Sequence, residues 1–166
     1  DLESMVLPDV EFQDARIWLE RLGEACRAIC RIEPQPESAG KHGYGTGFLV
    51  ADNIVMTCNH VAKPFWNDPH AVDRVVLRFD YQKAPDGSIG AGTTFKLAED
   101  WQIYTVGRPD FALLRVRPSQ TGGAKRCPIS LSNAGVKTDR PLLILQHPGG
   151  DPLKLLFGEI GSVDQE

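Results

Sequence analysis

The chain has 166 residues, a net charge of −4 and 42% hydrophobic residues, which are typical values for a folded globular protein. No Lys/Arg cluster is long enough to follow a phosphate backbone, so nucleic-acid binding is disfavoured, and no run of eighteen apolar residues predicts a membrane span. The cysteines, Cys26, Cys30, Cys58 and Cys127, form no CxxC pair. The pattern therefore predicts no metal site and no cofactor, and it favours free thiols in a reducing compartment.

Residues 9–26 are predicted to form a helix that begins after Pro8, with Asp9 as its N-cap. Apolar residues recur there at spacings of three and four, and we expect the stripe formed by Trp18 and Leu22 to pack the helix onto a sheet. From Cys26 to Ile32 the apolar residues alternate with others, which predicts a strand.

The rest of the chain reads as short strands separated by turns. Residues 45–51 and 54–57 are predicted to form a hairpin around Asp52 and Asn53, residues that tolerate tight turns. Further strands are expected at residues 73–80, 93–98, 110–116, 129–131, 141–146 and 153–160. Twelve prolines and sixteen glycines lie largely between these runs. This spacing is typical of an all-β barrel or sandwich.

Two segments carry the residues most typical of catalysis. The hairpin with its Gly-rich start at Gly45 and Gly47 leads directly to His60, and fifty residues later Asp110 opens an apolar strand. A buried carboxylate needs a partner, and an imidazole is a suitable one. Asp110 would accept a hydrogen bond from Nδ1–H of His60, which leaves Nε2 free to take a proton from a hydroxyl group.

With these segments, GTGFLV…TCNHV followed by DFALLRV, the chain resembles the chymotrypsin/trypsin-like serine peptidases. It is most similar to bacterial trypsin-like peptidase domains attached to effector-associated domains in immune (conflict) systems. The resemblance also includes the WLERL helix, the strand CRIE and QHPGG followed by PLKLLFG. It implies that His60 is the general base and Asp110 its orienting acid in an endopeptidase, the possible protease effector of a defence system.

The nucleophile of that family lies in a Gly-x-Ser-Gly loop, which this chain lacks. Ser162 follows Gly161 but has no glycine after it, and we interpret it as a strand residue. We therefore expect no nucleophile in this chain. Three explanations stay open: an N-terminal piece of a nicked protease, a chain that stops early, or a pseudopeptidase.

Other polar residues have simpler interpretations. His147 is expected to stabilise a Pro-Gly turn, and His42 and His70 to lie in solvated loops. Asp68 is a weaker alternative to Asp110 as the orienting acid. Cys58 is expected to be a buried strand residue, and Gly45 and Gly47 to allow close packing within the hairpin.

The resemblance implies an all-β, trypsin-like double β-barrel with an N-terminal helix. We expect residues 1–26 to form a helical extension packed on the barrel, 27–118 the first barrel, and 119–166 a connector and the first strands of an incomplete second barrel. The expected partners are the chain's own C-terminal protease half, a protein substrate, and a fused or associated signalling or effector protein, in the bacterial cytoplasm. The alternative function is a non-catalytic module that binds peptides by strand addition, or a regulatory piece of a nicked protease.

Overall fold

Six antiparallel strands close into a barrel in the computed structural model, which describes residues 14–35, 43–117, 126–132, 135, 137, 138 and 140–162. The elements, in chain order, are α1 (Ala15–Ala28), β1 (Ile29–Pro34), β2 (Gly45–Ala51), β3 (Ile54–Thr57), α2 (Asn59–Ala62), α3 (Ala71–Arg74), β4 (Val75–Phe79), β5 (Thr93–Val106), β6 (Phe111–Val116), β7 (Pro141–Gln146), the 3₁₀ turn η2 (Pro148–Gly150) and β8 (Lys154–Glu159). The expected all-β fold with an N-terminal helix is confirmed.

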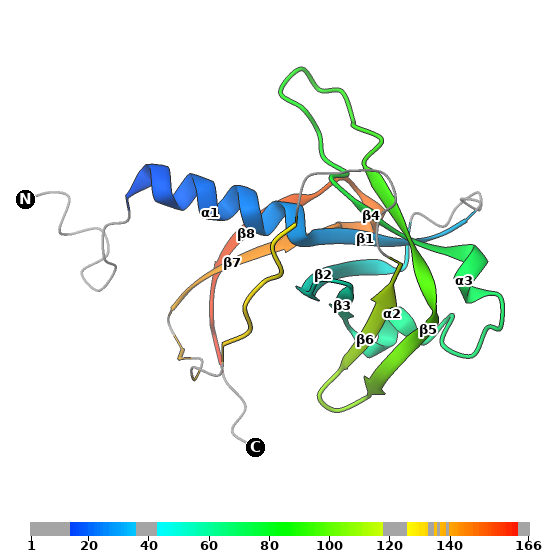
Figure 1. Ribbon diagram of the computed structural model, residues 1–166. Helices are drawn as coiled ribbons and strands as arrows, with labels where there is room; N and C mark the ends of the chain where they lie inside the picture. The colour runs from blue at the N-terminus through cyan, green and yellow to red at the C-terminus, as the bar shows by residue number, and fades with distance from the viewer. Residues whose placement is uncertain are drawn as a thin grey trace, which may run out of the picture.

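The barrel has the strand order β1-β2-β3-β6-β5-β4, and pairing of β1 with β4 closes it (Figure 1). Its interior is filled by apolar side chains that alternate along the strands, among them Ile32, Leu49, Val55, Leu77 and Leu114, each 3% exposed or less. Because every strand has two partners, the barrel leaves no open edge, and its faces divide into a packed inside and a largely solvated outside.

Helix α1 begins later and ends later than the sequence predicted. The side chain of Asp14 accepts hydrogen bonds from the backbone N–H groups of Arg16 and Ile17, so Asp14 is the N-cap of α1. Asp9 lies outside the described residues. The predicted stripe is only partly covered, with Trp18 and Leu22 half-buried. Figure 1 shows the helix projecting beyond the barrel, so the expected packing along a sheet is limited to its C-terminal end.

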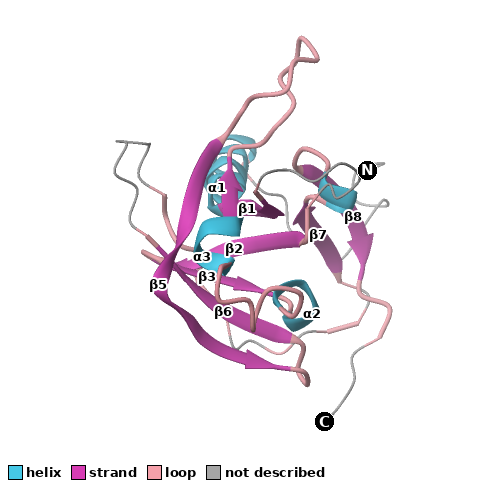
Figure 2. Ribbon diagram, turned by 90° about the vertical axis from the view of Figure 1, so that its right-hand side faces the viewer, coloured by secondary structure: helices cyan, strands magenta, loops and turns pink. Residues whose placement is uncertain are grey.

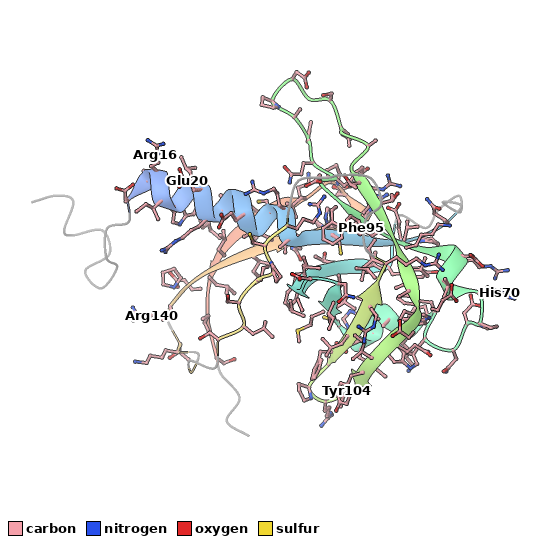
Figure 3. All side chains as sticks on the ribbon, in the orientation of Figure 1. Arg16, Glu20, His70, Phe95, Tyr104 and Arg140 are labelled. Carbon is pink, nitrogen blue, oxygen red and sulfur yellow. The ribbon has the colours of Figure 1, made fainter. Side chains whose placement is uncertain are left out.

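The outer face of α1 is polar where it meets solvent. Arg16 and Glu20 lie one turn apart on this face and form an exposed i,i+4 ion pair at 3.4 Å (Figure 3). Such a pair contributes only about 0.3–0.5 kcal/mol. Two apolar residues, Ile17 and Leu19, are 50% and 62% exposed. The helix therefore keeps apolar surface in solvent.

Strand β1 starts at Ile29, because α1 extends through Cys26, Arg27 and Ala28, where the sequence predicted strand. All six of its residues are buried, including two charged ones, Arg31 and Glu33. The polar face of the strand is covered by the 147–151 segment and by Arg78 of β4, which supply partners for its charges.

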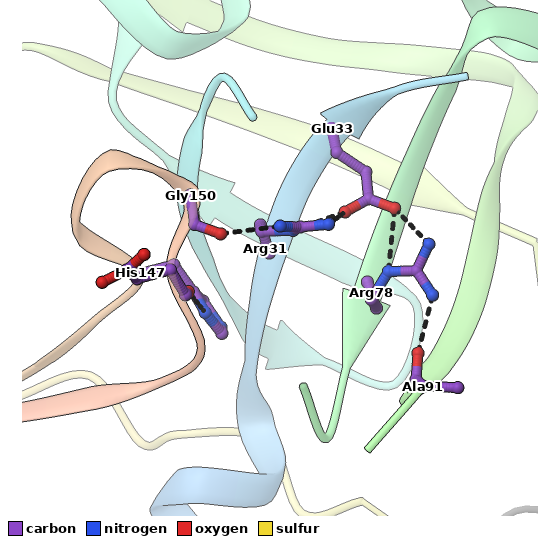
Figure 4. A network of polar contacts seen from close by, with 7 residues as sticks. Arg31, Glu33, Arg78, Ala91, His147 and Gly150 are labelled. Carbon is purple, nitrogen blue, oxygen red and sulfur yellow. Dashed lines mark hydrogen bonds and ion pairs between the residues drawn. The ribbon is translucent and has the colours of Figure 1, made fainter. Parts of the chain in front are cut away.

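Figure 4 shows how these charges are satisfied. Glu33 lies between two guanidinium groups: Arg31 Nε donates to Oε2 at 2.5 Å, and Arg78 Nε donates to Oε1 at 2.8 Å. The same arginines also donate to the backbone carbonyls of Gly150 and Ala91, both at 2.6 Å. This Arg31–Glu33–Arg78 network joins β1, β4 and the 147–151 segment.

The hairpin of β2 and β3 has the predicted bounds and turns at Asp52 and Asn53. Strand β5 is longer than predicted and reaches Val106, because its first part pairs with β4 and its second part with β6 across two register shifts. The predicted strand 73–80 begins instead as the short helix α3 and becomes β4 at Val75. Between β4 and β5 a long exposed loop extends away from the barrel (Figure 1).

Strands β7 and β8 form a separate two-stranded sheet beside the barrel, as both ribbon views show (Figures 1 and 2). Their register runs from Pro141↔Glu159 to Gln146↔Lys154. The predicted strand at residues 129–131 is not one. The Ile129 N–H donates to the Leu49 carbonyl at 2.8 Å and its side chain packs against the barrel core, but the segment has no strand assignment. Among the described residues no helix is long and apolar enough to cross a membrane.

Candidate active site

The register between β3 and β6 brings His60 and Asp110 together. Thr57, the last residue of β3, lies opposite Ala112 of β6. His60 follows Thr57 by three residues in the short helix α2, and Asp110 precedes Ala112 by two residues. Because the strands are antiparallel, the end of one and the start of the other meet at the same rim of the barrel.

Two hydrogen bonds join these residues. The Nδ1 atom of His60 lies 2.5 Å from Oδ2 of Asp110, and the backbone N–H of His60 donates to Oδ1 of the same carboxylate at 3.1 Å. The carboxylate thus contacts both the ring and the backbone of one residue, which fixes the orientation of the ring. The hydrogen bond from the imidazole is the main cause that lowers the pKa of Asp110 below its ordinary value.

The site is more exposed than the sequence suggested. The side chains of His60 and Asp110 are 70% and 42% exposed. The expectation of a buried acid that needs a partner is therefore wrong for Asp110. The pair is held by geometry at the barrel rim and not by the cost of burying a charge, and the Nε2 side of the imidazole is open to a reacting group.

Gly45 explains how α2 comes so close to the hairpin. A Cβ atom at Gly45 would lie 2.5 Å from Cγ2 of Val61, the residue after His60. A Cβ atom at Gly47 would lie 2.7 Å from Cγ1 of Val55 in the core. The prediction that these glycines allow close packing is confirmed. At Gly45 the packing also sets the position of the helix that carries His60.

Asn59 anchors the same helix from its other side. Its Oδ1 accepts a hydrogen bond of 2.6 Å from the Thr105 hydroxyl group near the end of β5. Sequence reasoning missed Thr105, because its partner is 46 residues away and no local pattern marks it. The two contacts, at Gly45 and at Thr105, hold α2 against β2 and β5.

Cys58 also lies beside the pair, and here the sequence expectation is wrong. It is exposed, ends no strand, and is the N-cap residue of α2. Partial burial of the sulfur is the main cause that raises the pKa of its thiol above the ordinary value, and the negative charge of Asp110 is the second. Its Sγ atom, a nitrogen of His60 and an oxygen of Asp110 all lie within 4.8 Å of one another.

The other candidates lie elsewhere. Asp68 accepts from the backbone N–H of His70 at 2.9 Å and lies 3.8 Å from Arg74, so the acid that contacts His60 is Asp110. His70 is exposed, and His42 lies outside the described residues. His147 is buried, and its backbone N–H donates to the Thr46 hydroxyl at 2.8 Å. Burial lowers the pKa of His147.

In the described part of the chain, the hydrogen bond of the His60 ring goes to Asp110, and the Ser88 hydroxyl donates to Asp86. Ser162 is exposed and lies beyond the end of β8, so its interpretation as a strand residue is wrong. In the described part of the chain the site consists of an oriented imidazole and a carboxylate. An imidazole held by a carboxylate in this way can act as a general base toward a hydroxyl group.

Comparison with known proteins identifies the family of the chain. A family model described as "Trypsin-like peptidase domain" matches residues 45–166, more than half of the chain. The uncharacterized protein y4fB of Sinorhizobium fredii (strain NBRC 101917 / NGR234) is 28% identical over 152 residues. That alignment covers 86% of this chain and 22% of the relative, so the chain spans about a fifth of the relative's length.

Two crystal structures share the fold. The Rv3671c protease in its inactive form is 18% identical with a TM-score of 0.52, and the similarity covers 92% of this chain and 61% of that one. Deg5 is 15% identical with a TM-score of 0.60, covering 94% of this chain and 69% of that one. At this identity the likeness shows the fold alone, and the trypsin-like fold expected from the sequence is confirmed.

Proposed function

Because this chain belongs to the trypsin-like peptidase domain family, we propose that it supplies the general base and the orienting acid of a serine endopeptidase. The observation that carries the proposal is the 2.5 Å contact between Nδ1 of His60 and Oδ2 of Asp110, at a rim where the other face of the imidazole is open. This contact fixes the tautomer with the proton on Nδ1.

In the proposed reaction, Nε2 of His60 takes the proton of a serine hydroxyl as its oxygen attacks the scissile carbonyl carbon. Asp110 stays ionised, since its pKa is lowered, and stabilises the imidazolium that forms. His60 then gives the proton to the leaving amine, the peptide C–N bond breaks, and an acyl-enzyme remains. Water hydrolyses this ester by the same route, with His60 again as the base.

We further propose that the nucleophilic serine lies in polypeptide outside these 166 residues. Support comes from the sequence, which contains no Gly-x-Ser-Gly motif, and from the β7–β8 sheet. A two-stranded sheet is marginal by itself, and this one exposes large apolar side chains: Leu142, Leu143, Leu155, Leu156 and Phe157, of which Phe157 is 67% exposed. A second half of the protease would cover this face. The role in bacterial defence and the cytoplasmic location stay predictions.

The test is cleavage of a peptide library by this chain together with the rest of its natural polypeptide. We expect Asp110→Asn to lower kcat by about 10⁴-fold, because the wrong tautomer is then favoured, and His60→Ala to lower it at least as far. His70→Ala is the matched control, an exposed histidine away from the pair, and it should cleave like the wild type. Equal turnover by His60→Ala and the wild type would remove His60 from the mechanism.

The exposed β7–β8 sheet also favours a second candidate, a non-catalytic module that binds an extended peptide along a free strand edge. For this module, His60→Ala would leave peptide binding unchanged and no cleavage would be found with any serine-containing continuation. Substitution of Phe157 by Asp would instead abolish binding. The two candidates therefore differ at His60→Ala, which lowers cleavage by the peptidase but leaves peptide binding by the module unchanged.

A further inference from the structure

The strongest unassigned cluster surrounds Cys58. Three side chains with different donor atoms, a thiol, an imidazole and a carboxylate, place one donor each within 4.8 Å of the other two. All three residues are exposed, so solvent ions reach them directly. The peptidase mechanism uses His60 and Asp110 but gives the thiol no task.

We propose that Cys58, His60 and Asp110 form a binding site for Zn²⁺, and that the bound ion switches off the general base. Thiolate, imidazole and carboxylate are the three ligand types that zinc takes in proteins, and three protein ligands leave its fourth position open to water. Mg²⁺ and Ca²⁺ prefer oxygen ligands and would not select this set.

The distances require only a small adjustment. Ligand atoms about 2.0–2.3 Å from a tetrahedral zinc ion lie about 3.3–3.6 Å from each other. His60 Nδ1 and Asp110 Oδ2 are at 2.5 Å and must separate, whereas the sulfur approaches from up to 4.8 Å. Both changes are about 1 Å, within reach of side-chain rotation at exposed positions.

Charge supports the same ion. A thiolate and a carboxylate together carry two negative charges, which a divalent cation balances. On binding, the thiol proton leaves to solvent and the sulfur–zinc bond replaces it, so the ion neutralises the two anionic ligands.

The consequence for catalysis rests on the proposed function. An ion bound at Nδ1 takes the place of the proton that His60 donates to Asp110, and the ring loses its orientation. An ion bound at Nε2 occupies the lone pair that would take the serine proton. In either coordination the imidazole no longer acts as a base, so Zn²⁺ inhibits reversibly and a chelator restores activity.

The binding test needs no substrate. The 166-residue chain, kept reduced with a phosphine, is titrated with Co²⁺ as a spectroscopic probe and then with Zn²⁺ as competitor. We expect one equivalent of Co²⁺ to give a thiolate-to-metal charge-transfer band that Zn²⁺ removes. Cys58→Ser should lose the band and weaken Zn²⁺ binding by more than about tenfold. Changing a residue that only contacts a metal ligand already weakens binding by about that factor, so losing the ligand itself should cost more. The matched control is Cys127→Ser, at another exposed cysteine.

Each outcome decides the proposal. Equal Zn²⁺ affinity for Cys58→Ser and the wild type, or loss of the band in Cys127→Ser, would overturn the site. The low-field NMR signal of the His60 Nδ1 proton reports whether the hydrogen bond between His60 and Asp110 persists. This signal should disappear when one equivalent of Zn²⁺ is added. A band with an unchanged proton signal would refute inhibition through the pair. Because no peptide is cleaved in these experiments, their failure is separate from failure of the peptidase proposal.

Discussion

Replacement of Glu33 by Gln tests whether the Arg31–Glu33–Arg78 network stabilises the barrel. Gln has the same shape as Glu and keeps one carbonyl oxygen, so it creates no cavity. It removes the negative charge between two guanidinium groups and turns an N–H₂ group toward one of them. The variant therefore isolates the loss of the charge from any loss of packing.

The exposures of the side chains set the expected size of the effect. The side chains of Glu33 and Arg31 are 1% and 5% exposed, whereas that of Arg78 is 21% exposed. Removing one partner of a buried ion pair costs about 3–5 kcal/mol, because the remaining charge stays buried without compensation. Arg78 can recover some hydration, so we expect the lower end, about 3 kcal/mol. For a chain of this length that corresponds to a fall in Tm of about 6–12 °C.

Urea unfolding followed by far-UV circular dichroism and tryptophan fluorescence measures the free energy of unfolding. Two of the three tryptophans report on the barrel, since the ring centroids of Trp66 and Trp101 lie 5.2 Å apart and both rings pack at or against its core. The control is Glu99→Gln, which breaks the exposed pair with Arg117 and should change the free energy by less than about 1 kcal/mol. If Glu33→Gln and Glu99→Gln lower the stability equally, the buried network is not a stabilising element.

Three further predictions use the same protein. Gly47→Ala should lower the free energy of unfolding by about 1–3 kcal/mol, because the added Cβ would lie 2.7 Å from Val55 Cγ1. The control is Gly161→Ala, since Gly161 has open space around it. Equal urea midpoints for the two variants would contradict the prediction. The hydrogen bond with His60 lowers the pKa of Asp110 in the folded protein. This interaction should therefore stabilise the fold at pH values above the ordinary carboxyl pKa of about 3.9. The stabilisation should be lost as the pH falls through the lower pKa of the folded state. The stability difference between the wild type and Asp110→Asn should therefore shrink only below about pH 4, and a difference that persists at lower pH would refute this. Cys30 is fully buried, and burial raises the pKa of its thiol. A disulfide reagent should therefore label Cys30 only when the protein unfolds, as measured by mass mapping. Labelling of Cys30 as fast as that of the exposed Cys127 would contradict this prediction.

Local patterns were enough to predict the elements that short-range chemistry decides. Residues 45–57 form a hairpin because two short apolar runs flank Asp52 and Asn53, which tolerate the turn. Helix α1 was expected from the spacing of its apolar residues, although its ends shifted. The helix starts at Ala15, and not at residue 9 as predicted, because Asp14 is its N-cap. The spacing of apolar residues within a helix does not show which acid caps it.

Long-range packing decided what the sequence pattern could not. Alternation predicted a strand around Arg31, but it did not predict the covering segment, more than 110 residues away, that buries its charges. Residues 129–131 have the composition of a strand and find no ladder, since β-structure needs a partner edge as well as a propensity. The predicted strand 93–98 did not include residues 99–106, which extend β5 because β6 pairs with them.

The sequence by itself determined that an imidazole follows one hairpin and that a carboxylate opens a later strand. Whether the two touch depended on the register of β3 against β6, which pairs Thr57 with Ala112. A slip of one residue would turn these side chains to the other face. The tertiary structure alone placed the thiol of Cys58 beside them and left all three exposed. Contacts between strands so far apart in the chain depend on the closure of the whole barrel, which no local pattern records.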